Sequence, residues 1–266
     1  MKPTLKVALI VLLLIGISYC GNAQFIWPNG AKAAICLTYD DALDGHLDYA
    51  IPQLDLAGLK GTFFCTGNST CLSKRMNEWR MAEKNGHELG NHTLFHPCLA
   101  IRPDGTKFDW VKHEYDLQNY NLPQLINELK TASTLLKAID GQEERTYGYT
   151  CSDCAVGGIP FTNSLKDLFT AARSDGPIPE TMIGYNIYQA PSWGVIDNSA
   201  DELIAYVNKA REKGTIAILM FHSVGGGYLN TGAEQHLKLA EYIRKNRKDF
   251  YCATFKEVMN YIRNAQ

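Results

Sequence analysis

The feature that most constrains the fold is a regular alternation of short apolar runs with segments of helical periodicity between residues 33 and 263. The apolar runs predict strands at 33–39, 62–65, 87–91, 146–150, 170–173, 186–190, 215–221 and 250–254. Apolar residues spaced by three or four predict helices at 47–57, 76–85, 122–139, 161–169, 201–212, 234–245 and 256–263. Gly58, Gly141 and Gly214 follow three of these segments and predict helix ends.

Strands and helices that alternate in this way predict a parallel sheet with helices covering its faces. The regularity of the pattern favours one α/β domain with a barrel-like sheet over two separate lobes. In such barrels the reactive side chains gather on the loops at the carboxyl ends of the strands. We therefore expect a functional site among the polar residues that follow the predicted strands.

The first residues have the layout of a secretory signal peptide. Two lysines precede the apolar run 7–17, which is too short for a comfortable membrane span. Gly21 and Ala23 are the small residues of a cleavage site before Gln24. We expect a signal peptide at 1–23 and an exported catalytic domain at 24–266, located in the periplasm, at the cell surface or outside the cell.

Two alternatives to a cleaved signal peptide rank lower. A lipoprotein signal would keep Cys20 as a lipidated N-terminus, but Tyr19 is bulky where that processing requires a small residue. A retained membrane anchor ranks third, so we expect no integral membrane span in the mature chain. The net charge of −2 favours neither a nucleic-acid partner nor an anionic membrane surface. The sequence does not indicate an oligomeric state.

Cysteine usage fits export but does not define the disulfides. The cysteines that remain after residue 23 are Cys36, Cys65, Cys71, Cys98, Cys151, Cys154 and Cys252. An odd number leaves at least one thiol free or paired outside the chain. We expect Cys65 and Cys71 to pair with each other or one of them with Cys98, and Cys36 to be a buried thiol. Cys151 and Cys154 are interpreted as loop cysteines or a local disulfide, in preference to half of a structural zinc site.

Polar residues that suit metal and acid–base chemistry follow three of the predicted strands. Asp40 and Asp41 end the first strand, and His222 follows the apolar strand 215–221. His92 and His96 follow the third strand and are four residues apart, which places both rings on one side of a helical turn. Two imidazoles and one carboxylate suit a catalytic divalent metal, with positions left open for water and substrate.

Each of these residues also has an ordinary structural explanation when taken alone. Adjacent acids favour helix N-caps, and a histidine at a strand end is often satisfied by a backbone carbonyl. A bare pair of histidines four apart is weak evidence for a metal. Three such coincidences at one edge of a barrel are harder to explain, so the sequence favours a metal site.

Three motifs resemble those of the polysaccharide deacetylases, carbohydrate esterase family four. They are Thr38-Tyr39-Asp40-Asp41-Ala42, His92-Thr93-Leu94-Phe95-His96 and Leu219-Met220-Phe221-His222. The resemblance extends over essentially the whole mature chain and implies a single deformed (β/α) barrel of about seven strands. It implies that Asp41, His92 and His96 bind one divalent metal ion, most commonly zinc, with cobalt, nickel or iron as alternatives. It also implies that Asp40 is the general base and His222 the general acid.

The middle motifs match the family less well. Family members carry an arginine that orients the base, beside a tyrosine whose backbone N–H stabilises the oxyanion. Tyr149 is the candidate for that tyrosine, while Arg145 and Arg173 are candidates for the arginine. Trp193 is a candidate for a wall that faces the sugar, or else a core residue.

A long aromatic segment and a glycine run complete the candidates. The segment 97–121 is long for a connection, and its aromatic residues are interpreted either as a platform for sugar rings or as a seal at the barrel rim. Those residues are Phe108, Trp110, Tyr115 and Tyr120. The run Gly225–Gly227 is too generic to indicate a phosphate loop.

The function favoured by the sequence is a secreted, metal-dependent hydrolase that removes N- or O-linked acetyl groups from a polysaccharide or oligosaccharide. One alternative is a carbohydrate-binding protein on the same barrel that has lost turnover. The other is a barrel metallohydrolase that cleaves a different C–N amide bond. The presence of both Asp40 and His222 favours an active enzyme.

Overall fold

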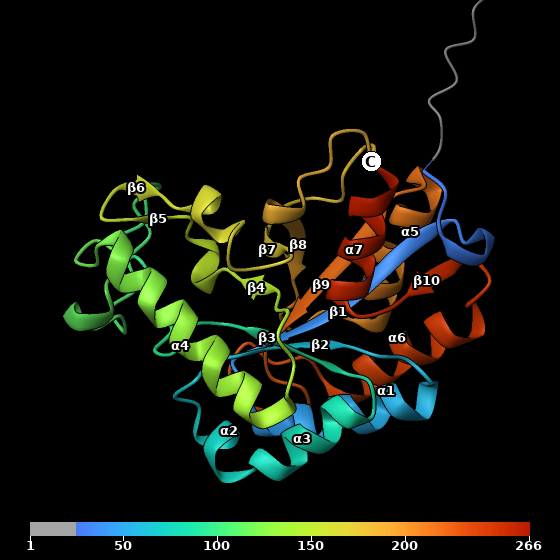
Figure 1. The fold of residues 1–266 in the computed structure, drawn as a ribbon. Helices are drawn as coiled ribbons and strands as arrows, with labels where there is room; N and C mark the ends of the chain where they lie inside the picture. The colour runs from blue at the N-terminus through green and yellow to red at the C-terminus, as the bar shows by residue number, and fades with distance from the viewer. Residues whose placement is uncertain (1–24) are drawn as a thin grey trace, which may run out of the picture.

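The computed structural model describes residues 25–266, and its centre is a closed barrel of seven parallel strands (Figure 1). In barrel order these are β1 (Ala33–Asp40), β2 (Thr62–Cys65), β3 (Glu88–Asn91), β4 (Tyr147–Gly148), β7 (Ala172–Asp175), β8 (Ala190–Gly194) and β9 (Ile216–Phe221). Pairing of β9 with β1 closes the sheet. The predicted barrel is confirmed, while the predicted signal peptide and Cys20 lie outside the described residues.

Strand β1 pairs with more strands than any other strand of the barrel. Along one edge it pairs with β9, and along the other it pairs first with β10 (Phe250–Cys252) and then with β2. All eight residues of β1 are buried, as expected for a parallel strand covered on both faces. The strand therefore forms a rigid support for the two acids at its carboxyl end.

Helices cover the outside of the barrel, with α4 on one side and α5, α6 and α7 on the other (Figure 1). Their bounds are α1 (Ile51–Ala57), α2 (Thr70–Lys74), α3 (Met76–Lys84), α4 (Leu122–Asp140), α5 (Ala200–Lys213), α6 (Ala233–Lys245) and α7 (Phe255–Ala265). The predicted stops at Gly58, Gly141 and Gly214 all have left-handed backbone, which terminates α1, α4 and α5. No helix among residues 25–266 is long and apolar enough to cross a membrane.

Short elements fill the connections. A π-helical turn (His46–Ala50) precedes α1, and 3₁₀ turns lie at Pro28–Gly30, His113–Tyr115, Thr150–Ser152, Thr162–Leu165 and Ile187–Gln189. β5 (Ala155–Val156) and β6 (Ile159–Pro160) form a small hairpin.

Two predicted elements are wrong. The helix expected at 161–169 is only the turn Thr162–Leu165, because Phe161, Leu165 and Phe169 reach the core beside α4 from irregular backbone. The strand expected at 186–190 begins only at Ala190, because the Asn186 side chain caps a 3₁₀ turn by accepting from the Tyr188 N–H at 3.0 Å.

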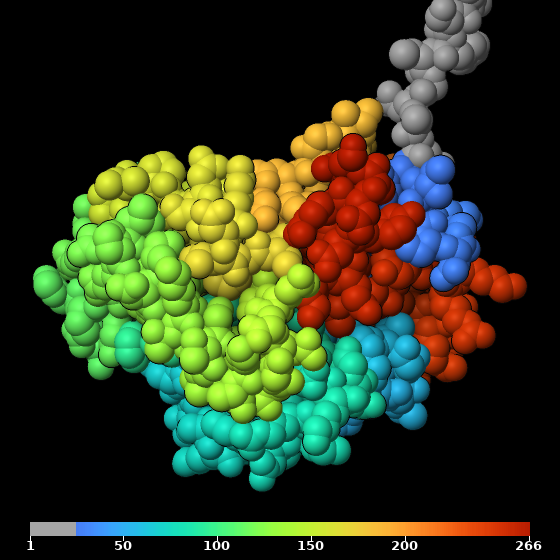
Figure 2. Space-filling model, viewed as in Figure 1, coloured from blue at the N-terminus to red at the C-terminus, as the bar shows by residue number. Residues whose placement is uncertain are grey.

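The N-terminal segment is packed against the last helix. Trp27 is buried, and its ring stacks on Tyr261 of α7 with ring centroids 6.1 Å apart. The Tyr261 hydroxyl donates to the Ile26 carbonyl at 2.7 Å. Figure 2 shows the two segments side by side on the surface. These contacts cover the outer face of the barrel next to α7 and leave the carboxyl ends of the strands free for a site.

Candidate active site

A cavity of about 1030 Å³ lies at the carboxyl ends of the barrel strands. Its lining includes Asp40 and Asp41 at the end of β1, His92 after β3 and His222 after β9. His96 also lines it. The residues that the sequence singled out at strand ends therefore meet in one cavity, as the barrel geometry requires.

Asp41, His92 and His96 face one another within this cavity. Asp41 Oδ1 lies 3.5 Å from His92 Nε2 and 3.4 Å from His96 Nε2. One donor atom from each of the three residues lies within 4.8 Å of the other two, which suits a shared cation. The backbone φ of Asp41 is +79°, so the chain leaves β1 in a left-handed turn that aspartate tolerates better than most residues. The turn brings the carboxylate under both imidazoles.

His92 is held in the tautomer that a metal ligand needs. The Gly148 carbonyl lies 2.8 Å from Nδ1, and because a carbonyl can only accept, Nδ1 carries the proton. Burial lowers the pKa of His92 to about 4, so the ring is neutral at pH 7. The lone pair on Nε2 therefore points toward Asp41. Burial raises the pKa of Asp41. The electrostatic effect of His96 and His92 outweighs burial and holds that pKa well below its usual range.

Asp40 is fixed by Arg173, which comes from β7. Arg173 Nη2 donates to Asp40 Oδ2 at 2.6 Å, and both side chains are almost fully buried. The guanidinium also donates from Nη1 to Ser192 Oγ at 3.3 Å and lies 5.0 Å from the centre of the Phe64 ring. Asp40 Oδ1 has no partner among the described residues. One oxygen of Asp40 is thus anchored, and the other is buried and unpaired within this part of the chain.

Gly148 makes room for this arginine. It pairs with Arg173 in the β4–β7 register. A Cβ at position 148 would lie 3.0 Å from Arg173 Nη2, 2.9 Å from Phe64 Cγ and 3.2 Å from His92 Nδ1. The guanidinium therefore occupies space that a side chain on β4 would otherwise fill. Of the two arginines considered from sequence, Arg173 is the one that contacts the proposed base.

We expect Gly148→Ala to displace the guanidinium and to lower both stability and turnover. Overpacking of this kind costs about 1–3 kcal/mol of unfolding free energy, and the shift would separate Arg173 from Asp40. Chemical denaturation and kcat measure the two effects. Gly232→Ala is the matched control, because a Cβ there meets only Gln235 Cγ at an ordinary 3.5 Å. Equal stability and turnover for Gly148→Ala and wild type would contradict this role for Gly148.

His222 lines the cavity and is held through its backbone. His46 Nδ1 accepts from the Leu43 N–H at 3.2 Å, so His46 Nε2 carries the proton and donates to the His222 carbonyl at 2.7 Å. Burial lowers the pKa of His46 to about 4, which keeps this ring neutral. His222 Nδ1 is buried without a partner among the described residues. His46 therefore orients the His222 backbone, and the His222 imidazole lines the cavity.

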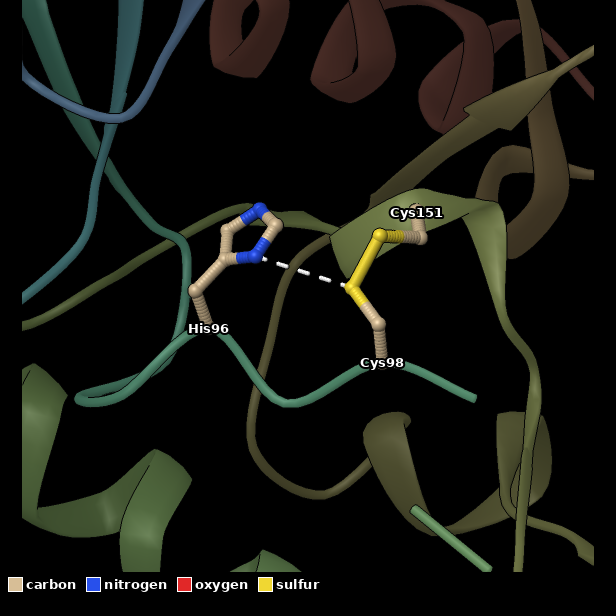
Figure 3. Close-up of side chains that lie close together, drawn as sticks. All are labelled: His96, Cys98 and Cys151. Atoms are coloured by element: carbon tan, nitrogen blue, oxygen red, sulfur yellow. Dashed lines mark hydrogen bonds between the residues drawn. A yellow bond between two sulfur atoms is a disulfide. The ribbon is translucent and has the colours of Figure 1, made fainter. Parts of the chain in front are cut away.

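A disulfide lies beside His96 (Figure 3). Cys98 and Cys151 are bonded, and Cys98 Sγ lies 3.6 Å from His96 Nδ1. The bond ties the loop that carries His96 to the turn after β4, which also lines the cavity. His96 and the two sulfurs are close enough to form a second metal cluster, but the disulfide leaves no thiolate to act as a ligand.

This pairing corrects the expected disulfides. Cys65 is buried in β2 and Cys71 lies in α2, and both are free thiols. Cys154, the second cysteine of the 151–154 pair, is exposed and free, while Cys36 is a buried thiol as predicted. The 53-residue separation of Cys98 and Cys151 explains why spacing along the chain did not reveal the bond.

The other sequence candidates fulfil only part of what was expected of them. Tyr149 lines the cavity, but its backbone N–H donates to the Arg173 carbonyl at 3.0 Å in the sheet and is not free to stabilise an oxyanion. Trp193 does not line the cavity, and of its two expected positions the one in the core is confirmed. Strand alternation turns it away from Ser192 and toward α5, where it packs on Tyr206 with ring centroids 4.8 Å apart.

Arg145 has a structural role. It is buried, pairs with Asp140 at the end of α4 and donates to the Leu89 carbonyl at 2.8 Å. It does not line the cavity, so it fixes α4 to β3.

The aromatic segment 97–121 contributes only in part to the cavity. Phe108 and Trp110 line it, and the Trp110 ring lies 6.0 Å from the His96 ring. Tyr115 instead stacks on Phe95, and Tyr120 is buried in the core cluster beside α4. Two of the four aromatic residues therefore fit the platform interpretation, and two fit the rim interpretation.

Tyr228 contacts the site and was not identified from the sequence. Its hydroxyl donates to Asp41 Oδ2, and it lines the cavity. The only sequence signal was the preceding glycine run, whose turn presents this side chain. Thr66 was also missed, and its hydroxyl lies 3.4 Å from Asp41 Oδ1.

The closed parallel barrel, with polar side chains gathered at the carboxyl ends of its strands, places the chain among the (β/α)-barrel proteins. The polysaccharide deacetylase family model matches residues 28–155, a range that includes Asp40, Asp41, His92 and His96. The resemblance seen in the motifs is thereby confirmed, and over this range the chain is similar to the polysaccharide deacetylases.

Individual relatives are distant. A gellan lyase from a Bacillus species is 25% identical over 186 residues, which are 68% of this chain but only 6% of that protein. A candidate polysaccharide deacetylase from Mycobacterium smegmatis superposes with a TM-score of 0.62 at 15% identity, over 91% of this chain and 94% of its own. A pseudoenzyme of carbohydrate esterase family four from Bacillus anthracis superposes with a TM-score of 0.51 at 14% identity. The superposition covers 87% of this chain and 66% of the pseudoenzyme. These structural likenesses concern the fold alone.

Proposed function

We propose that this chain is an exported, metal-dependent hydrolase that removes N- or O-linked acetyl groups from a polysaccharide or oligosaccharide. The observation that carries the proposal is the meeting of Asp41, His92 and His96 with an arginine-anchored Asp40 in one cavity. The match to the polysaccharide deacetylase family model supports the reaction class. The N-terminal sequence and the Cys98–Cys151 disulfide both support export to an oxidising compartment.

The residues present fit a divalent cation. Asp41 Oδ1 and the two Nε2 atoms converge, and the Gly148 carbonyl fixes the His92 tautomer so that a lone pair faces the same point. Two nitrogens and one carboxylate oxygen form a donor set that zinc commonly takes, and that cobalt, nickel or iron also accept. A cation bound there would polarise the acetyl carbonyl and lower the pKa of a water molecule.

The protein's own groups then carry the protons. Asp40 Oδ1 is unpaired and accepts a proton from the attacking water, while Arg173 keeps the carboxylate in place through Oδ2. His222 donates a proton to the departing amine or sugar oxygen, and His46 fixes its backbone. Phe108 and Trp110 give the cavity an aromatic wall suited to a sugar ring.

Acetate release tests this function. Chitin-, peptidoglycan- and xylan-derived oligomers, together with gellan, are incubated with the protein after chelation and again after addition of Zn²⁺, Co²⁺ or Ni²⁺. We expect acetate from at least one polymer, lost on chelation and restored by metal. Polymer binding without acetate release under all conditions would instead support the binding-protein alternative, which the existence of a pseudoenzyme in the family makes relevant. Ammonia or amine release without acetate would support cleavage of another amide bond.

A further inference from the structure

The glycine-rich turn after β9 has a specific geometry that the proposed reaction does not explain. Gly225, Gly226 and Gly227 all have positive φ, at 83°, 141° and 111°. The φ of Gly227 favours glycine, and a Cβ there would lie 2.5 Å from Ser223 Oγ, so that hydroxyl would have to move to admit a side chain. The turn is closed at its base, where the Thr231 N–H donates to the Ser223 carbonyl at 2.8 Å.

The turn presents Tyr228 to the cavity. Its ring is about half exposed and lies 5.9 Å from the His222 ring. Its hydroxyl donates to Asp41 Oδ2. A surface tyrosine from the last barrel loop thereby contacts an acid at the end of the first strand, 187 residues away in sequence.

The two oxygens of Asp41 consequently have different surroundings. Oδ1 faces His92 Nε2 and His96 Nε2 at 3.5 and 3.4 Å, while Oδ2 is occupied by the tyrosine. Without the phenol, the carboxylate could rotate and offer either oxygen, or both, to a cation. Hydrogen bonds to ligating carboxylates orient them, and their loss typically weakens metal binding by about 10–100-fold.

We propose that Tyr228 is a positioning residue for the metal centre, which holds Asp41 so that Oδ1 alone is presented to the ion. The inference rests on the proposed metal site and adds a residue to it. It also gives the glycine run a role, because the left-handed turn is what brings the phenol back over the end of β1.

The test is metal affinity of the full chain carrying Tyr228→Phe, measured by competition with a chromogenic chelator for Zn²⁺ and for Co²⁺. The substitution keeps the ring and removes only the hydroxyl. We expect the affinity to fall by about 10–100-fold. We also expect a change in the visible spectrum of bound Co²⁺, and an unchanged unfolding midpoint for the metal-free protein.

Tyr49→Phe is the matched control. Its ring packs under the same turn, against Gly225, and its hydroxyl makes no hydrogen bond among the described residues. We expect it to bind both ions as wild type does. Equal affinity of Tyr228→Phe and wild type would overturn this inference alone. A wild-type chain that binds neither ion would overturn the metal site together with the inference.

Discussion

Asp40→Asn should lower kcat for acetate release by about 10²–10⁴-fold while leaving the metal bound, because general-base catalysis contributes an effect of that size. Asparagine has the shape of aspartate and can still accept the Arg173 hydrogen bond through its carbonyl oxygen. It cannot take a proton from water at the position of Oδ1. The proposed ion would be held by Asp41, His92 and His96, so its occupancy should persist.

Two measurements on the same preparation separate the base from the metal centre. Metal content is determined by elemental analysis, and turnover is measured at saturating metal. The unfolding midpoint is recorded as well, because a neutral side chain at position 40 leaves the buried Arg173 without its counter-charge. A folded, metal-loaded variant with a near-normal rate would show that the base has been assigned to the wrong residue.

Much of the fold and site could be predicted from the sequence because the relevant signals are local. Apolar runs identified the long strands β1 and β9, and the residues that follow them directly are Asp41 and His222. In a parallel barrel, every residue that directly follows a strand lies at the same rim. These residues could therefore be placed together without knowing which strands pair.

The features that could not be predicted depend on register between strands or on distant loops. The sequence named both Arg145 and Arg173 as candidates but could not choose between them, because Arg173 reaches Asp40 only where β7 lies beside β4 and position 148 lacks a side chain. β4 has only two residues, which are too few to show the alternation of apolar and polar residues that identifies a strand. For Trp193 the sequence left a sugar-facing wall and a core position open, because the expected strand ended at 190 and the alternation along β8 could not be used to choose between them.

Asp41→Ala and His92→Ala should abolish metal binding and acetate release together. Each substitution removes one of three converging donors, and in His92→Ala the Gly148 carbonyl also loses its hydrogen-bond donor. This outcome differs from that of Asp40→Asn, where the ion stays and only the chemistry is lost. The measurement is metal content by elemental analysis after dialysis, alongside acetate release with and without added Zn²⁺.

The matched control is His113→Ala, which removes an exposed imidazole from the segment 97–121 at a point that does not line the cavity. It should keep both metal and turnover. Chelated wild type should regain activity when metal is restored, whereas the two site variants should not, because the donors themselves are missing. If Asp41→Ala kept its rate in the absence of bound ion, the reaction would not depend on a metal held by Asp41. In that case Asp40, Arg173 and His222 would have to account for the hydrolysis on their own.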